Sequence, residues 1–533
     1  MRLPLPLLST ILTGTLCAQI TTHRQPFGPG QAVASNKYEV FVSHGSAPEQ
    51  KLDVVMSIAD PRGDYAATEL LGRTFSFASI DYNLDGAPLN FRVVKKFGTP
   101  STAAAIAPRS YGFQPTLTGE NEVRFSVNTN NRTFSVHFKG ADNETAKQKW
   151  IAHMLCIFID PPETDKPNRA EKGVLVFNPK TTPAELSAAS TIFFPAGHHN
   201  LRAFASGAPI VDGTLTLKSN QSVYLEGGTF VEGLITTESS ADKNQRIFGR
   251  GILSGRQYPR TGKTFNGGRA YRQIVRLGHE AISVDGVTLM ESPTHGIVAG
   301  STKISNVKLI GWHCNNDGFR VDSGSEIKNC FIRAADDHFY NFNIWVHDCV
   351  LWAGHNGAIL TYGWGGSKSY DSGASLLENI DIIHPEWMSL GNNNSLVATQ
   401  TALAFKPKSY NGKTTTILRN IRIEGTIPGL VNIKPRSEAD GLVIATKVPL
   451  EKVGFLGDTL FESITVDAQS GQSRIKGTTD AAIEGKATYF VQEIRFKNIK
   501  IGSKWITPEN ASKYFEIDPA TTRDITFSVS DKK

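Results

Sequence analysis

Val284-Asp285-Gly286-Val287-Thr288-Leu289 is the stretch that decides the fold, because its pattern returns seven more times along the chain. Each copy reads apolar, any residue, then Asn, Gly or a small polar residue, then apolar, any, apolar. The apolar residues of the second half alternate, as they do in a β-strand. The other copies occupy residues 304–309, 327–332, 346–351, 377–382, 418–423, 461–466 and 496–501.

The spacing of these copies indicates how they stack. The inner apolar residues of the first four copies, Val287, Val307, Cys330 and Cys349, lie 20, 23 and 19 residues apart. A strand-bearing unit repeated at about 20 residues is typical of a solenoid, whose coils bury their apolar faces only against each other. A leucine-rich repeat shares this period but needs a leucine pattern that is absent here. We therefore expect an all-β chain with a right-handed parallel β-helix over residues 191–533.

The first part of the mature chain follows another pattern. Residues 37–42, 123–127 and 134–138 alternate apolar and polar positions and are separated by Gly, Asn and Pro turns. This pattern favours an antiparallel β-sandwich over residues 19–165. Residues 166–190 are rich in Pro, Lys and Glu and are predicted to form the linker.

The N-terminus indicates export, and the net charge gives no sign of a nucleic-acid partner. Residues 1–18 contain Arg2 and then an apolar run that is too short to span a membrane, which predicts a signal peptide. The mature protein is then secreted, or periplasmic in a Gram-negative host. A formal net charge of +6, spread over 533 residues without a dense Lys/Arg block, does not indicate nucleic-acid binding or a membrane surface.

The cysteines leave one question open and argue against a metal site. Cys330 and Cys349 occupy the same inward position on neighbouring coils, where stacked strands lie about 4.8 Å apart. A disulfide fits that spacing, and two thiols in a core ladder fit it as well. No Cys/His pair has ligand spacing with a second pair to match, so a metal site is not expected.

Three carboxylates mark the candidate catalytic site. Asp317 precedes Gly318, and the pair Asp336-Asp337 follows about one coil later. Aligned by coil, they give a polar column of His295, Asp317, Asp337 and Asn356, spaced 22, 20 and 19 residues apart. Carboxylates one coil apart perturb each other's pKa and leave one of them protonated as an acid. Neighbouring strand residues point to opposite faces, so the backbone must turn if Asp336 and Asp337 both reach a cleft.

Other residues near the aspartates are candidates for substrate contact. Five of the seven tryptophans lie within 76 residues, and we expect two or three of them to line the cleft: Trp312, Trp345, Trp352, Trp364 and Trp387. His355 and His384 fit either ligand contact or a buried turn. A second polar series is expected to be structural and to satisfy turn backbone: Asn306, Asn329, Asn379, Asn420 and Asn498.

With these motifs the chain resembles glycoside hydrolase family 49, the dextranase and isopullulanase family. Asp317-Gly318 matches the family's Thr-Asp-Gly motif with Asn316 in place of Thr, and Asp336-Asp337 matches its Asp-Asp pair at the same separation. Gly363-Trp364 and Ile383-His384 match shorter signatures. The lysine that the family places shortly after Asp-Asp is absent; His338, Phe339 and Tyr340 occupy that stretch.

The resemblance implies an inverting hydrolase of α-glucan without a cofactor. Asp336 would be the general acid, and Asp317 and Asp337 would activate the attacking water. The candidate substrate-binding residues are His355, Trp364, His384 and Tyr340. The expected substrate is dextran, cleaved at α-1,6 linkages by a monomeric enzyme. The alternatives are isopullulanase-type cleavage of pullulan, a polygalacturonase-like pectin hydrolase, and a non-catalytic glycan-binding solenoid.

Overall fold

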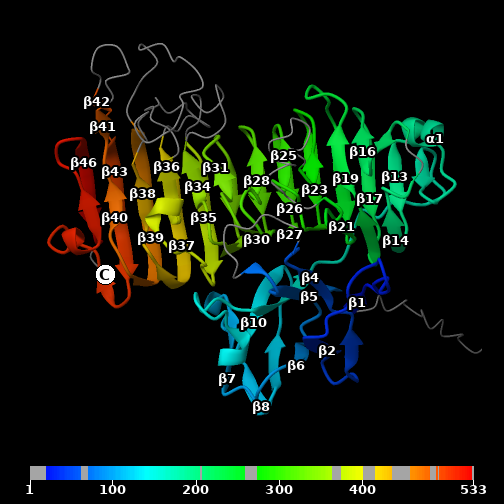
Figure 1. The fold of residues 1–533 in the computed structure, drawn as a ribbon, viewed down its shortest axis with the longest axis horizontal. Coiled ribbons are helices and arrows are strands. Elements are labelled where there is room, and N and C mark those ends of the chain that lie inside the picture. The colour runs from blue at the N-terminus through cyan, green and yellow to red at the C-terminus, as the bar shows by residue number, and fades with distance from the viewer. Residues whose placement is uncertain are drawn as a thin grey trace, which may run out of the picture.

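The computed structural model describes residues 20–61, 70–204, 207–258, 273–362, 374–399, 415–434, 456–479, 488–489 and 491–530. The predicted signal peptide, residues 1–18, lies outside the described residues. Figure 1 shows a β-sandwich, in blue and cyan, packed against the side of a long β-helix that runs from green to red.

The sandwich consists of two sheets. One has the order β1-β5-β11-β10-β7, with β4 also paired to β5, and the other has the order β3-β2-β6-β9-β8. Its pairs are antiparallel except that β5 and β11 run parallel, a pairing that the alternation pattern did not predict. The strands are β1 Ile20–Thr22, β2 Tyr38–His44, β3 Gln50–Leu52, β4 Val55–Ile58, β5 Thr74–Tyr82, β6 Leu89–Lys95, β7 Ala103–Ala107, β8 Thr116–Gly119, β9 Glu122–Val127, β10 Arg132–Lys139 and β11 His153–Asp160. Short 3₁₀ turns are η2 Arg109–Tyr111 and η3 Ala141–Asn143.

The rest of the chain is a right-handed parallel β-helix with three faces, as predicted. The first face contains β13 Thr191–Phe194, β17 Ser222–Leu225, β20 Arg246–Gly249, β23 Ile282–Asp285, β26 Thr302–Ser305, β29 Glu326–Lys328 and β32 Trp345–His347. The second face contains β14 Gly197–Asn200, β18 Thr229–Glu232, β21 Ile252–Ser254, β24 Thr288–Met290, β27 Lys308–Ile310, β30 Phe331–Ala334 and β33 Val350–Ala353. Longer strands then cover both faces: β35 Leu376–Ile383, β37 Thr416–Ile427, β39 Leu456–Gln469 and β43 Val491–Ile501. The last strand, β46 Thr522–Ser528, pairs with the first half of β43 and extends the first face alone.

The third face is a separate sheet. It contains β15 Ile210–Val211, β16 Thr214–Leu217, β19 Leu234–Thr237, β22 Val275–Arg276, β25 Ile297–Ala299, β28 Phe319–Val321, β31 Phe339–Tyr340, β34 Ala358–Tyr362, β36 Ser395–Thr399, β38 Val431–Ile433, β40 Ser473–Ile475 and β45 Phe515–Ile517. Smaller elements are β41 Thr478–Thr479, β42 Thr488–Tyr489, β44 Lys504–Trp505, η5 Leu390–Asn392 and η8 Ala511–Lys513.

The six-residue repeat is the corner between the first and second faces. At this corner Asn306, Asn329, Asn379, Asn420 and Asn498 have φ angles of 53° to 56°. Asparagine enters this left-handed region more readily than most residues, because its short polar side chain bonds locally. The inner residues Cys330 and Cys349 lie in the core as unbridged thiols, 2% and 1% exposed. The structure thus has the thiol alternative rather than the disulfide.

The predicted linker, residues 166–190, contains ordered elements that the composition did not indicate. Strand β12, Val174–Val176, pairs parallel with β13 and opens the first face. Helix α1, Pro183–Ala188, begins with a capping box between Thr182 and Glu185, and its Leu186 is buried in the core of the β-helix. Three apolar residues among many charges, and a six-residue helix, are too short to stand out in a sequence pattern.

The sandwich covers the second face of the β-helix. Phe75 and Phe158 of the sandwich pack against Phe331 of β30, with ring centroids 5.7 and 5.4 Å apart. The Arg250 and Asp81 side chains form a buried ion pair across the same interface at 2.9 Å. The strands of this face lead directly into the turns that carry the aspartates, so the sandwich lies next to the candidate site. In the part of the chain that is described, no helix is long and apolar enough to cross a membrane.

Candidate active site

The three aspartates lie in turns that join the second face to the third. Asp317 follows β27, and Asp336 and Asp337 follow β30 on the next coil. The register pairs Ile297 with Phe319 and Phe319 with Phe339. Residues two positions earlier therefore stack, which brings His295, Asp317 and Asp337 into one column as predicted.

The fourth member of the predicted column is wrong. Phe339 pairs with Leu360, which places Ala358 beside Asp337. Asn356 lies two residues earlier because the connection after β33 is two residues longer than the one after β30: in the register, Trp352 to Leu360 spans eight positions and Arg333 to Phe339 six. Gly357 in the turn after β33 has a φ of 70°. Asn356 instead donates its amide to Asp336 Oδ2 at 2.8 Å. Asn356 thus contacts the candidate catalytic residue Asp336 from outside the column.

Asp317 is held on both of its oxygens. His295 Nδ1 lies 2.9 Å from Oδ1, and the Tyr340 hydroxyl donates a hydrogen bond to Oδ2. Asp317 is 3% exposed. The burial of Tyr340 and the negative charge of Asp317 raise the pKa of the Tyr340 hydroxyl well above its usual range. The tyrosine therefore stays a donor, and the site holds Asp317 as an oriented acceptor.

The backbone bends at Asp336. Asp336 Oδ2 accepts from the Asn315 N–H at 2.8 Å in addition to Asn356, and Oδ1 accepts from the Asp337 N–H at 3.0 Å. At 9% exposure it is the most accessible of the three aspartates. Burial and the charge of Asp317 raise the pKa of Asp336 to about 6. A carboxyl group that keeps its proton in mildly acidic solution can act as a general acid.

Asp337 is the most enclosed of the three, at 1% exposure. Its Oδ1 accepts hydrogen bonds from the Ala358 N–H at 2.9 Å and the Thr361 hydroxyl at 2.6 Å. Burial and the charges of Asp336 and Asp317 raise its pKa well above the usual range. Asp336 and Asp337 therefore retain protons at pH values where isolated aspartates are ionised.

Asn316, which replaces the family's threonine, joins the two turns. Its Oδ1 accepts from the backbone N–H groups of Trp312 and His313 at 2.7 and 3.1 Å. Its backbone carbonyl accepts from the N–H groups of Ala335 and Asp336 at 3.1 and 3.2 Å. The sequence marked this position only as a departure from a motif, and gave no sign that one residue would tie both turns together.

The predicted substrate-binding residues divide into three groups. Tyr340 belongs to the site through Asp317. His355 is buried next to the turn that carries Asp317, with its Nε2 3.6 Å from Cys314 Sγ. Burial lowers the pKa of His355 to about 4. His384 lies instead between the two domains, where its Nε2 is 2.7 Å from the Ser135 hydroxyl of the sandwich. Trp364 is outside the described residues.

The expectation that several tryptophans line the cleft is not met by the described ones. Trp312 and Trp352 are 2% and 1% exposed and face the sandwich. Trp345 lies on the first face, where its Nε1 donates to Glu378 at 2.9 Å, and Trp387 is buried in the core of the β-helix. The second face is covered by another domain, so its large aromatic residues fill that interface.

Two hollows among the described residues lie away from the aspartates. One of about 550 Å³ lies between the domains and is lined by Asn130, Asn329 and Asp381, among others. Another of about 790 Å³ lies on the sandwich, beside Phe91 and Phe125. Neither is lined by Asp317, Asp336 or Asp337, so the assignment of the site rests on hydrogen bonds and charge.

Similarity to known proteins extends over most of the chain. No family profile matches it. A dextranase from Arthrobacter globiformis is 22% identical over 465 residues, covering 75% of this chain and 71% of that protein. An isopullulanase from Aspergillus niger is 23% identical over 489 residues, covering 85% and 78%.

Among solved structures, Dex49A from Penicillium minioluteum superimposes with a TM-score of 0.73 at 19% identity. The match covers 96% of this chain and 99% of that one, and it shows that the two share a fold. Together, the relatives and the structural match support the assignment of the chain to glycoside hydrolase family 49, the dextranase and isopullulanase family, as its motifs implied.

Proposed function

We propose that the protein is a secreted α-glucan hydrolase that cleaves α-1,6 linkages of dextran with inversion of configuration. The observation that carries the proposal is the group of three buried carboxyl groups on adjacent coils, in which burial and the charge of Asp317 raise the pKa of Asp336 to about 6. The similarity to dextranases supports the choice of substrate.

The mechanism assigns one role to each carboxyl group. Asp336, the most accessible of the three, protonates the leaving glycosidic oxygen. Asp317 and Asp337 activate the attacking water: Asp317, oriented by Tyr340 and His295, takes its proton, because the raised pKa of Asp337 leaves that carboxyl group protonated. An inverting enzyme needs its acid and base about 6.5–9.5 Å apart, so that a water molecule fits between the base and the sugar. Strands on adjacent coils lie about 4.8 Å apart, so inversion requires that the offset of Asp336 within its turn supply the remaining separation.

Isopullulanase-type cleavage of pullulan is the second candidate. It is favoured by the Aspergillus niger isopullulanase, whose match covers more of this chain than that of the Arthrobacter globiformis dextranase. The two candidates differ in the bond cleaved, because dextran and pullulan place different linkages at the site. The same three carboxyl groups serve both reactions.

The first experiment measures reducing-sugar release from dextran, pullulan and polygalacturonate in parallel, with Asp336→Asn protein as the control. Release from dextran that disappears in the variant supports the proposal, and release from pullulan alone selects the second candidate. Release from polygalacturonate alone moves the protein to the pectin hydrolases. Glycan binding without any product identifies a binding solenoid.

Two further assays test the remaining parts of the proposal. Proton NMR of the first product formed distinguishes inversion, which yields the β-anomer from an α-glucan, from retention. N-terminal sequencing of the exported protein tests cleavage after residue 18, and light scattering tests the monomer.

A further inference from the structure

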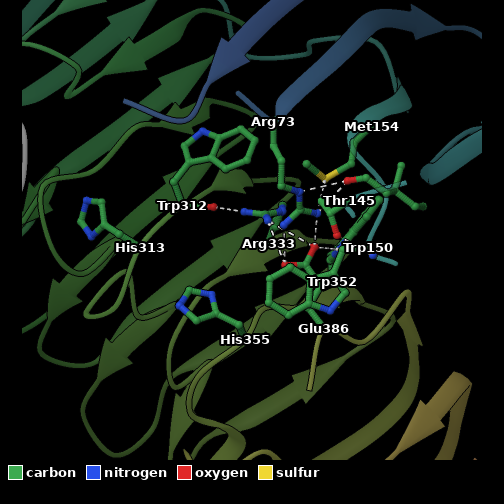
Figure 2. A network of polar contacts seen from close by, with 12 residues as sticks. Arg73, Thr145, Trp150, Met154, Trp312, His313, Arg333, Trp352, His355 and Glu386 are labelled. Atoms are coloured by element: carbon green, nitrogen blue, oxygen red, sulfur yellow. Dashed lines mark hydrogen bonds and ion pairs between the residues drawn. The ribbon is translucent and has the colours of Figure 1, made fainter. Parts of the chain in front are cut away.

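A buried charge network joins the sandwich to the β-helix next to the catalytic turns. Arg73, which directly precedes β5 of the sandwich, makes a two-pronged ion pair with Glu386 of the β-helix, with Nη1–Oε2 and Nη2–Oε1 distances of 3.0 and 2.7 Å. Arg333 of β30 approaches the same carboxylate at 3.3 Å. Figure 2 shows the three side chains meeting between Trp312 and Trp352.

These charges are fully withdrawn from solvent, since Arg73, Glu386 and Arg333 are each 0–1% exposed. Although burial raises the pKa of Glu386, the two guanidinium groups lower it to about 2, so the carboxylate stays ionised. Burial of ion pairs adds little net stability, because the loss of hydration offsets the attraction. Because burying these three charges costs hydration free energy, stability alone does not explain the network.

The network is connected directly to both catalytic turns, residues 311–317 and 335–338. Arg333 lies three residues before Asp336. Its guanidinium donates to the carbonyl of Gly311, where the other turn begins, and lies over the Trp312 ring at 4.6 Å. The same tryptophan donates its Nε1–H to the Ser57 hydroxyl of the sandwich at 2.9 Å. A shift of Arg333 would thus move both turns together.

We propose that Arg73 is a positioning residue of the active site, which fixes Glu386 and through it Arg333 and the two catalytic turns. The sandwich then contributes to catalysis by setting the separation of Asp317 and Asp336, without touching the substrate. The inference rests on the proposed hydrolase function, because it assigns the network to the geometry of that site.

The chain offers a matched control on the same face. Lys308 of β27 and Asp160 of the sandwich form another buried ion pair between the domains. Lys308 is the first residue of its strand, at the asparagine corner, whereas Arg333 is the third residue of β30, next to the catalytic turn. Loss of either pair weakens the interface, and only loss of the Arg73 network is expected to loosen the catalytic turns.

The experiment compares Arg73→Met and Glu386→Gln with Lys308→Met and Asp160→Asn in the full-length protein. We expect kcat per folded molecule to fall about 10- to 100-fold in the first pair, since small misplacements of catalytic groups have effects of that size. KM changes less than kcat, and the pH above which activity is lost moves down as Asp336 separates from Asp317. The second pair lowers Tm but leaves kcat and the pH profile unchanged.

Arg73→Lys and hydrogen–deuterium exchange make the test independent of one variant and of activity. A lysine keeps the charge but cannot form the two-pronged pair, so it should give an intermediate kcat. Exchange in peptides covering residues 311–317 and 335–338 should increase in Arg73→Met and Arg73→Lys but not in Lys308→Met. Equal loss of kcat in both pairs, or unchanged exchange in those peptides, overturns the proposal. Failure of the proposed function appears separately, as a wild-type protein that hydrolyses no glucan.

Discussion

Two corners of the same coil differ in a way that separates structure from function. The corner between the first and second faces repeats with little change, with Asn306, Asn329 and Asn379 at φ angles of 53° to 55°. The corner between the second and third faces changes from coil to coil and holds the buried aspartates. Repetition preserves the backbone conformation that the solenoid needs, while each irregular turn aims a particular side chain. Substitutions at the two corners should therefore differ in their effects on activity and stability.

The largest contrast is an Asp-to-Asn change at each corner. Asp336→Asn removes the proton donor and should lower kcat by about 10³-fold, within the range of general acid catalysis. Asp348→Asn makes the same change at the asparagine corner, where Asp348 has a φ of 54° and asparagine is the usual residue. It should leave kcat and Tm unchanged. Reducing-sugar assays and thermal melts of both proteins decide the matter; a large loss of activity in Asp348→Asn would contradict the division.

Tyr340→Phe tests the hydrogen bond that orients Asp317, the proposed base. The change removes the hydroxyl that donates to Asp317 Oδ2 and keeps the ring. A hydrogen bond to a charged group contributes about 1.5–3 kcal/mol, so kcat should fall about 10- to 100-fold. KM for dextran should change little, because the hydroxyl serves the carboxylate. A variant with reduced kcat but an unchanged melting curve supports this role, and one with wild-type kcat refutes it.

The pH dependence follows from the sign of the Asp336 shift. Its pKa is raised to about 6 in the folded protein, from an ordinary value of 3.8. The acid form is lost as pH rises through about 6, so kcat should fall about tenfold per unit above that point. For the same reason Asp336 contributes stability at low pH that is lost between about pH 4 and 6. A pH profile of kcat that stays flat from 5 to 8 would rule out Asp336 as the acid.

The smallest effect is expected at the asparagine corner. Asn329→Ala places alanine at a φ of 53°, which should lower the free energy of unfolding by about 1 kcal/mol and leave kcat intact. Asn329→Gly is the matched control, because glycine adopts this conformation without strain. Denaturant unfolding of the two variants measures the difference, and equal stabilities would show that the left-handed turn is not the reason for asparagine.

Much of the fold could be predicted because the repeat is local. The six-residue pattern records one corner and the strand after it, and its period gives the stacking, so the β-helix followed from short segments. The β-helix was predicted to start at residue 191, but its first strand is β12, Val174–Val176. Nothing in the sequence indicated β12 or α1, because both are too short to show a period. The stacking of His295, Asp317 and Asp337 also followed from the spacing, whereas Asn356 failed because one longer turn shifts the alignment.

The sequence by itself determined the solenoid, the stacked aspartates and the family resemblance, because each depends on residues at most about a coil apart. Only the tertiary structure decided what depends on contact between the domains. It buried Trp312 and Trp352 under the sandwich, placed His384 against Ser135, and brought Arg73 to Glu386 across 313 residues of chain. No sequence period carries that information, since the docking of two domains is set by the shapes and charges of surfaces that form only after each has folded.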